Sequence, residues 1–441
     1  MSVTVDLMRA MIRNRCVNDG TRESGQEKRS VRTLQDFFGV EGKVFEPAPG
    51  RQSLVYRVKG SDPDHPSIAL VPHLDVVPAD ASGWTVDPFA AEVVDGAVYG
   101  RGAVDMLNVT AAMAVAARPY IRGEIVPQAD LVFCATADEE AGGRFGALPL
   151  VRDRWDLVGV DFLLSEVAYP GLPAVGHRRV PVSIGEKGAY WSILEAAGTP
   201  SHGSAPYGTD NAISKLVAAL AGIEETPSPA AIDDVWIEFV DALPLDDEIK
   251  SRLGDLDAID EAIDEIAVTD PSLARYVHAA THLTISANVF QGGSKTNVVP
   301  DQARAELDIR SLPDMDRRYV DTHLRKSMGM ASDYIEIEPV QDGDSTISER
   351  NTLLWEAISA AVLDLEGHSD LVPAVMTVAT DARFWRAKGT VAYGVGLFDD
   401  SMSFSEMLAL FHGHDEHVSL ESVDRTAGLY ERVLELFMAE R

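Results

Sequence analysis

The 441-residue sequence contains only two cysteines, and it has no long apolar run. Cys16 and Cys134 are too few for a disulfide framework or a cysteine metal site. No stretch approaches the roughly 18 consecutive apolar residues of a membrane-spanning helix. The start, MSVTVDLMRAMIRNRC, lacks the basic region, apolar core and cleavage site of a signal peptide. These absences predict a cytoplasmic protein without a membrane partner.

Basic residues are also scarce, since 38 Lys and Arg stand against 70 Asp and Glu and the formal net charge is -32. Binding to a phosphate backbone depends on clustered basic side chains, so the composition argues against a nucleic-acid partner. The hydrophobic fraction of 46% and the charged fraction of 24% are those of an ordinary globular chain. The length favours more than one domain.

Strand-like and helix-like patterns alternate along the first part of the sequence. The apolar runs SLVYRV, IALVPHLDVV, LVFCATA and DFLLSEVA, with the helical segment VTAAMAVAARPYI, predict an α/β domain. Its central sheet should be mostly parallel and flanked by helices. From about residue 186, strands that suggest hairpins lie beside two helices, a pattern typical of a smaller α+β domain. We expect one domain over residues 1–185 and 343–441, with the second inserted over 186–342.

Within this insertion, residues 246–277 form an acidic segment. Leu253, Leu256, Ile259 and Ile263 recur there at helical spacing. The segment is therefore predicted to form solvated helices rather than a disordered loop.

The stretch IALVPHLDVVPAD, residues 68–80, interrupts a buried strand with two polar groups. His73 and Asp75 lie two positions apart, so in an extended chain they project from the same face. We expect both to emerge at the carboxyl end of a core strand. Taken alone, such a pair is more often a hydrogen-bonded polar pair than a metal site.

Further polar groups follow other predicted strands. Ligands bind at the carboxyl ends of strands in open α/β sheets, so groups far apart in the sequence can converge there. Two imidazoles and several carboxylates suit a pair of divalent metals. A helical zincin site is excluded near the C-terminus, because Gly413 stands where that motif requires histidine. The polar groups are Asp105, Asp138, Glu139, Glu140, Glu166 and His412.

The order and spacing of the motifs resemble a known family. HLDVVP, GRGAVDM, ATADEEAGG, GEKGAYW, SHGSAP, GGSKTNVVP, LDIRSLP, TDARFW and HGHDEHV occur in the family's order across nearly the whole chain. This is the clan MH family of dinuclear zinc exopeptidases and deacylases. Its members include glutamate carboxypeptidase, acetylornithine deacetylase, succinyl-diaminopimelate desuccinylase, aminoacylase and carboxypeptidase S. The resemblance implies two divalent metal ions, zinc in the first instance, although cobalt or manganese suits the same ligands.

The resemblance also implies a set of five metal ligands. Asp105 would bridge the two ions. His73 and Glu166 would complete one site, and Glu140 and His412 would complete the other.

Two further roles follow from the resemblance and from the chemistry. Glu139 would be the general base, and the carboxylate of Asp75 would accept the second ring N–H of His73. Three carboxylates and a bridging hydroxide would balance two Zn²⁺ ions, and water bound there reaches a pKa of roughly 7. The nucleophile is then available at neutral pH.

The inserted domain of the resembled family serves as a lid and a dimerisation surface. The resemblance implies a homodimer in which His202 reaches the active site of the partner subunit. It also implies that Asn297 and Arg310 bind the substrate's carboxylate or nearby oxygens. Gly394 and Gly396 would contribute a backbone loop to the same task.

The sequence thus predicts a metal-dependent hydrolase of an amide or peptide bond in a small dipeptide or N-acyl amino acid with a free carboxylate. The alternatives are a biosynthetic deacylase, of the acetylornithine or succinyl-diaminopimelate type, and a non-catalytic metal-binding module. The intact Glu139 argues against the last of these. Many members carry lysine where this chain has Leu107 and Asn108, so the role of that lysine is absent or replaced.

Overall fold

The computed structural model describes residues 1–439 and has a larger sheet whose centre is parallel. β3, β6, β7 and β19 are the parallel central strands. β3 and β6 are buried at every position, which is the pattern of strands covered on both faces. The sheet order is β1 (Lys43–Ala48), β2 (Arg51–Val58), β6 (Leu131–Ala135), β3 (Ile68–Leu70), β7 (Phe162–Ser165), β19 (Val391–Gly394), β9 (His177–Glu186) and β17 (Thr346–Ile347), with β8 (Leu172–Ala174) and β18 (Leu371–Met376) also paired to β9.

Helices cover both faces of this sheet, as the α/β prediction required. Alternate residues of the central strands face two separate hydrophobic clusters. One cluster holds α1 (Val3–Arg13), α2 (Lys28–Phe38), α3 (Leu107–Ile121), α12 (Leu353–Glu366) and α15 (Leu420–Phe437). The other holds α4 (Ala147–Asp153), α5 (Trp155–Val158) and α13 (Ala382–Arg386). The fold class is confirmed.

α3 is the most deeply enclosed of these helices. It is apolar on almost every side, so it can be stable only inside the core. Leu107 and Asn108 are both buried at its start. No basic side chain occupies either position. A small sheet of β4 (Glu92–Val94), β5 (Ala97–Tyr99) and β20 (His417–Ser419) lies apart from the large one.

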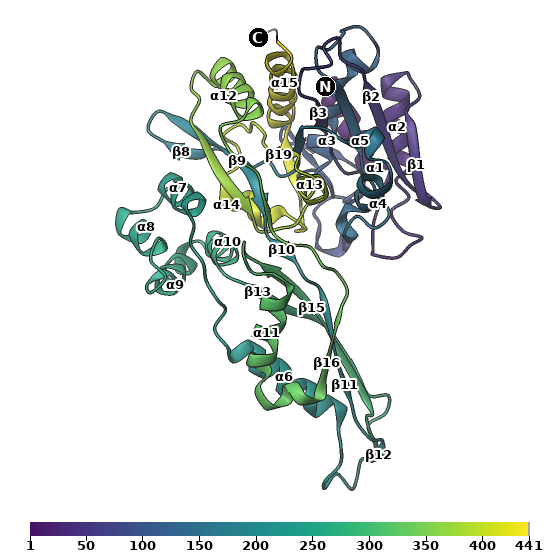
Figure 1. Cartoon of the computed structure of the whole chain (residues 1–441), viewed down its shortest axis with the longest axis vertical. Helices are drawn as coiled ribbons and strands as arrows, with labels where there is room; N and C mark the ends of the chain where they lie inside the picture. The colour runs from purple at the N-terminus through teal and green to yellow at the C-terminus, as the bar shows by residue number, and fades with distance from the viewer. Residues whose placement is uncertain (440–441) are drawn as a thin grey trace.

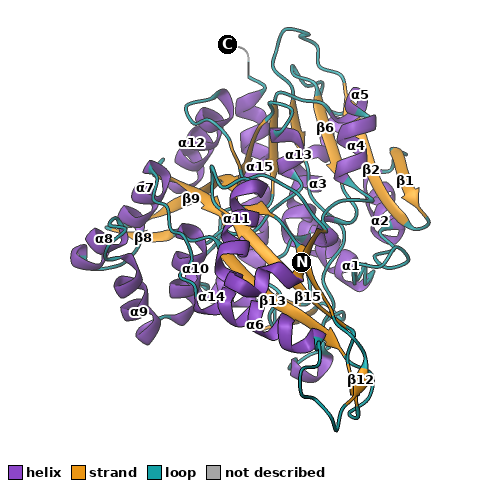
Figure 2. Ribbon diagram, turned by 60° about the horizontal axis from the view of Figure 1, so that its bottom comes forward, coloured by secondary structure: helices purple, strands orange, loops and turns teal. Residues whose placement is uncertain are grey.

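A second sheet forms the smaller part of the molecule. In β15 (Gln302–Ser311) every second residue is buried, because one face packs against α6 (Ala212–Glu225) and α11 (Arg317–Met328). Figure 2 shows these helices lying over the strands. The remaining elements are β10 (Gly188–Ala189), β11 (Ser192–Ala197), β13 (Thr284–Gly292), β16 (Ile335–Pro339) and the turn η3 (Gly329–Tyr334).

This smaller part projects far from the larger sheet (Figure 1). Its tip is a two-stranded ribbon of β12 (Ser201–His202) and β14 (Val298–Val299). β13 is an edge strand that pairs only with β15 among the described strands, and most of its residues are exposed. A long exposed edge strand is a ready surface for pairing with another chain. The domain boundaries at residues 186 and 342 stay a prediction.

The acidic segment does form helices, but they do not cover the smaller sheet. Apolar residues of these helices join the hydrophobic core of the larger part. They stand beside that part in Figure 1. Within residues 1–439, no helix combines the length and apolar character needed to cross a membrane. The helices of this segment are α8 (Asp247–Leu253), α9 (Ile259–Thr269) and α10 (Pro271–Thr281). α7 (Asp234–Ala242) precedes it, and α10 packs beside α14 (Phe404–Leu410).

Candidate metal centre

His73 and Asp105 meet at the carboxyl end of the parallel strands. β3 ends at Leu70, and the chain continues beside β6 so that His73 pairs with Thr136 in an isolated parallel bridge. The buried His73 imidazole places Nε2 3.2 Å from Asp105 Oδ1 and 3.5 Å from Glu166 Oε2. Glu166 directly follows β7, the neighbouring parallel strand. Parallel register therefore brings His73 and Glu166 together, whereas Asp105 lies on the turn between β5 and α3.

A second imidazole lies on the other side of Asp105. His412 Nε2 is 3.5 Å from Asp105 Oδ2 and 3.3 Å from Glu140 Oε2. The two carboxylate oxygens of Asp105 thus each face a different histidine. Donor atoms of His73, Asp105 and Glu140 lie within 4.8 Å of one another, and so do those of His73, Glu139 and Glu166. This is the separation expected of groups that share metal ions.

The pKa shifts of the clustered side chains show that several charged groups lie close together there. Burial raises the pKa of Glu166 to about 7, and burial and the neighbouring Asp105 raise the pKa of Glu140. Burial opposes protonation of His412, but Asp105 and Glu140 raise its pKa to about 10. Glu140 Oε1 is buried and has no hydrogen-bond partner within residues 1–439. A crowded set of carboxylates with an unpartnered oxygen fits divalent cations.

Asp75 supports the centre differently from the expectation. His73 Nδ1 lies 3.0 Å from the backbone oxygen of Asp75, whereas the Asp75 carboxylate is 3.6 Å away. That carboxylate instead accepts hydrogen bonds from the side chain of Asn18 and from the backbone N–H groups of Glu139 and Glu140. The carboxylate turns away because it has three donors on its other side. Asp75 therefore orients His73 through its carbonyl and the Glu139–Glu140 turn through its side chain.

A buried ion pair fixes the other end of that turn. Asp138 adopts a left-handed backbone conformation, with φ of 67°, immediately before η2 (Glu139–Ala141). Its Oδ1 lies 2.7 Å from a nitrogen of Arg51, and Arg51 also pairs with the buried Glu27. The position of Glu139 and Glu140 is thus set by a network that begins outside the cleft.

Glu416 is a supporting residue that the sequence did not reveal. Its buried side chain accepts hydrogen bonds from the backbone N–H groups of Gly102, Val104 and Asp105 and pairs with Arg101 at 2.7 Å. It therefore holds the loop that carries Asp105. Four positions separate it from His412 in the sequence, and nothing in the HGHDEH run distinguished it from a rim residue.

The metal cluster opens into a cleft of about 410 Å³. Arg310 and Trp191 of the smaller part form one wall, and Arg310 also pairs with Asp308 at 2.6 Å. Arg383, Tyr169 and Phe411 line the cleft as well, and none of them was expected there from the sequence. Arg383 belongs to the TDARFW motif, which the sequence revealed, but its place in the cleft did not follow from the sequence.

The other predicted site residues lie in different places. His202 and Asn297 are exposed at the tip of the smaller part, and neither lines the cleft of its own chain. Gly394 packs directly against the backbone of Glu166, where a Cβ atom would lie 2.2 Å from the Glu166 oxygen. Gly396 lines a separate cavity on the far side of that loop.

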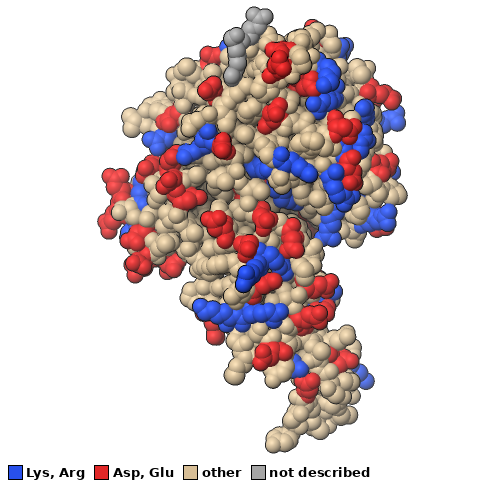
Figure 3. All heavy atoms as spheres, in the orientation of Figure 1, with Lys and Arg blue, Asp and Glu red and all other residues tan. Residues whose placement is uncertain are grey.

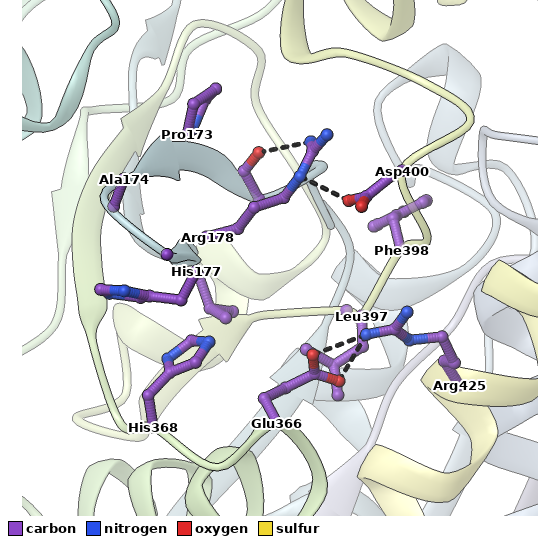
Figure 4. A pocket seen from close by; sticks show the side chains of 14 residues that line it. Pro173, Ala174, His177, Arg178, Glu366, His368, Leu397, Phe398, Asp400 and Arg425 are labelled. Carbon is purple, nitrogen blue, oxygen red and sulfur yellow. Dashed lines mark hydrogen bonds and ion pairs between the residues drawn. The ribbon is translucent and has the colours of Figure 1, made fainter.

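That separate cavity, of about 540 Å³, is drawn in Figure 4. Its guanidinium groups are already neutralised. Arg178 pairs with Asp400 at 2.6 Å, and Arg425 pairs with Glu366 at 2.6 Å. Both guanidinium groups of the cavity are therefore already paired with carboxylates and offer little to a charged ligand.

In Figure 3 the visible face of the molecule carries acidic and basic side chains interspersed, with no continuous basic surface.

The fold and the cluster define a metallohydrolase, and comparisons with known proteins identify its family. Residues 69–436 match peptidase family M20/M25/M40. The chain belongs to this family. The resemblance noted from the motifs is confirmed, as is the assignment as an enzyme.

Several curated relatives are similar over most of their length. A probable carboxypeptidase S-like protein of Dictyostelium discoideum is 27% identical over 401 residues, 87% of this chain and 74% of the relative. The human N-fatty-acyl-amino acid synthase/hydrolase is 25% identical over 424 residues, 90% and 81% of the two chains. Aminoacylase-1 of Sus scrofa is 27% identical over 403 residues, 90% and 86%. The chain is a metallohydrolase of this family.

Solved structures agree on the fold. A metallo-carboxypeptidase of the M20 family from Sulfolobus solfataricus has a TM-score of 0.73 at 17% identity, with 99% of both chains covered. A di-peptidase from Saccharomyces cerevisiae has a TM-score of 0.71 at 17% identity, with 99% of this chain and 95% of that one covered. A dinuclear metal-binding peptidase of the family from Bacillus subtilis has a TM-score of 0.59 at 15% identity, covering 98% of both.

Proposed function

We propose that this chain hydrolyses the amide bond of a small N-acyl amino acid or dipeptide that carries a free carboxylate. The observation that carries the proposal is the placement of Asp105 between His73 and His412, one histidine at each carboxylate oxygen. A carboxylate in that position can bridge two cations. The likeness to relatives named as acyl-amino acid hydrolases and carboxypeptidases supports the substrate class.

The donor set fits two zinc ions. Asp105 would bridge them, His73 and Glu166 would hold one, and Glu140 and His412 would hold the other. Imidazole and carboxylate donors also suit cobalt and manganese. When bound, such a pair polarises the substrate carbonyl and activates water.

Glu139 is the proposed general base. It lies beside Glu140 and within reach of the His73–Glu166 group. Its carboxylate takes a proton from the attacking water and returns it to the nitrogen of the leaving amine. Burial raises the pKa of Glu139 well above its usual value, and the charge of Glu166 acts in the same direction. A carboxylate of raised pKa is suited to both halves of this transfer.

Arg310 is the proposed partner of the substrate's carboxylate. It stands across the cleft from the metal cluster, and its planar guanidinium can bind a carboxylate through two parallel hydrogen bonds. The substrate-binding role implied for Gly394, at the end of β19, and for Gly396, just after it, stays a prediction, because neither lines the cleft described above.

We further propose that the active form is a homodimer through the smaller part. Asn297 and His202 lie on the exposed tip, so they can act on a cleft only if another chain presents them. The exposed edge strand β13 supports this association.

A hydrolysis screen tests the function. The purified protein, loaded in turn with Zn²⁺, Co²⁺ and Mn²⁺, is offered N-acetyl, N-succinyl and long-chain N-acyl amino acids together with free dipeptides. Cleavage of an N-acyl amino acid or of a free dipeptide supports the proposal, and the relative rates on the two kinds of substrate distinguish a deacylase from a dipeptidase. Preference for the succinylated substrate would favour a biosynthetic desuccinylase, a class also represented among the relatives. Metal binding without any turnover would favour a non-catalytic module.

A further inference from the structure

Tyr169 lines the metal cleft, although none of the steps above uses it. It follows Glu166 by three positions, after β7, and only 3% of its surface is exposed. The Tyr169 hydroxyl makes no hydrogen bond within residues 1–439. It is also absent from the fully buried polar atoms that lack a partner, so its oxygen keeps some exposed surface. Buried tyrosine hydroxyls usually find a partner. The small exposed part of Tyr169 therefore includes a hydroxyl that opens into the cleft.

The ring of Tyr169 is held by aromatic side chains from distant parts of the chain. Its centroid lies 5.1 Å from that of Phe404, 6.4 Å from that of Phe411 and 6.3 Å from that of Tyr276. The last two pairs are edge-to-face, the arrangement that aromatic quadrupoles prefer. Three such contacts leave the ring little freedom. The hydroxyl is consequently a fixed group rather than a mobile one.

Tyr169 lines the same cleft as Asp105 and Glu166. Burial raises the pKa of Tyr169, and the nearby carboxylates of Asp105 and Glu166 act in the same direction. A tyrosine phenol, with an ordinary pKa of about 10, is protonated at neutral pH and can donate a hydrogen bond. Its natural acceptor is an oxygen that becomes negative during the reaction.

We propose that the Tyr169 hydroxyl donates a hydrogen bond to the scissile carbonyl oxygen of the substrate while negative charge develops there. This inference rests on the proposed amide hydrolysis. As the water oxygen bonds to the carbonyl carbon, the π electron pair moves onto the carbonyl oxygen. The pair returns when the C–N bond breaks and the amine leaves with the proton from Glu139. The phenol keeps its own proton throughout.

In this proposal, Tyr169 is the hydrogen-bond donor that each chain supplies to the substrate in its own cleft. His202 of the partner subunit would be the second donor in the proposed dimer. Oxyanion holes commonly use two donors, and removal of one costs about 100-fold to 1,000-fold in kcat. An active site without the partner subunit would then keep part of its stabilisation of the developing oxyanion through Tyr169.

The experiment compares Tyr169→Phe with Tyr276→Phe in the zinc-loaded enzyme. Both changes delete one hydroxyl from the same aromatic group, but Tyr276 lines a different cavity beside Trp236 and Phe239. With the best substrate of the wild type, Tyr169→Phe should lower kcat by about 100-fold with little change in KM. Tyr276→Phe should match the wild type. Metal content and Tm should be unchanged in both.

Binding of a phosphinate analogue of an N-acetyl amino acid gives a readout that does not need turnover. Its tetrahedral oxygen stands in for the developing oxyanion. Tyr169→Phe should weaken its Kd by at least tenfold while leaving the Kd of the free amino acid product unchanged. If the wild type cleaves no substrate, the proposed function fails and the phosphinate comparison still decides on Tyr169. A Tyr169→Phe enzyme within threefold of the wild type in kcat, or with unchanged phosphinate binding, overturns the inference.

Discussion

Glu416 accepts a hydrogen bond from the backbone N–H of Asp105 at 3.1 Å, although the two residues are 311 positions apart. The same carboxylate accepts from Val104 at 2.7 Å. The C-terminal part of the chain thus sets the backbone position of a residue proposed to bridge two metal ions. Changes to residues in that supporting position usually lower metal affinity or activity.

Glu416→Gln should therefore weaken metal binding. The amide can accept at only one of its two ends, so part of the Gly102–Asp105 loop loses its anchor. We expect metal affinity to fall by about 10-fold to 100-fold, measured by competition with a chelator. Glu421→Gln, on the exposed start of α15, is the matched control and should bind metal as the wild type does. Equal affinities in the two variants would contradict the role of Glu416.

Glu139→Ala should retain both metals and lose at least the roughly 100-fold in kcat typical of general-base removal. The reason is that Glu139 is proposed to move a proton, whereas Glu140 is proposed to bind metal. Glu140→Ala, one residue away, should instead lose bound metal. Metal analysis and kinetics on the same preparations distinguish the two. A metal-replete Glu139→Ala enzyme with near-normal turnover would refute the assignment.

Arg310→Lys should raise KM for a free-acid substrate far more than for its carboxamide. Only the acid loses a paired charge, and lysine cannot reproduce the two parallel hydrogen bonds of a guanidinium. Arg304→Lys is a close control, because Arg304 is on the same strand and pairs with Glu306 much as Arg310 pairs with Asp308. Equal effects of Arg310→Lys on both substrates would exclude the proposed contact.

His202→Ala and Glu139→Ala dimers should each be nearly inactive on their own. After mixing and subunit exchange, one cleft of each heterodimer combines an intact Glu139 with the intact His202 of the partner subunit. Activity should then partly return, as followed by a hydrolysis assay, with exchange verified by native mass spectrometry. Complete exchange without recovery would show that His202 does not act across the dimer.

Removal of the metals should destabilise the folded chain as well as abolish activity. Bound ions stabilise the native state in proportion to their affinity, and without them the carboxylates of the cleft repel one another. A chelator should lower Tm, and added Zn²⁺, Co²⁺ or Mn²⁺ should restore it. The Glu140→Ala variant should show a smaller change in Tm on chelation. An unchanged Tm for the wild type would contradict a metal centre at this place.

The sequence predicted the central sheet and the polar cluster because both depend on local signals. Continuous apolar runs mark strands buried on both faces, and polar residues directly after them must emerge at one edge of a parallel sheet. His73 and Glu166 meet for that reason, whereas Asp105 lies on the turn between β5 and α3 and is held by Glu416. The prediction of an α/β domain with an inserted α+β domain likewise depended on local signals, namely the lengths of the predicted strands and the spacing of apolar residues in the predicted helices.

Other features depended on contacts that no local pattern contains. The supporting role of Glu416 comes from backbone groups more than 300 positions away, and the place of Tyr169 comes from aromatic rings on α10 and around α14. An amphipathic pattern in residues 246–277 predicted helices with one buried face. It could not say that this face would pack on the larger part of the molecule.

The packing of helices α7–α10 has a mechanical consequence. The chain passes between the two parts after β9, between α6 and α7, between α10 and β13, and again between β16 and β17. Any change in the angle between the parts must bend all of these connections together. Hinge motion is absorbed by a few residues in such connections, so here it would have to be shared among residues in all of them. The distance between Arg310 and the metal cluster is thus governed by the stiffness of several backbone segments acting in parallel.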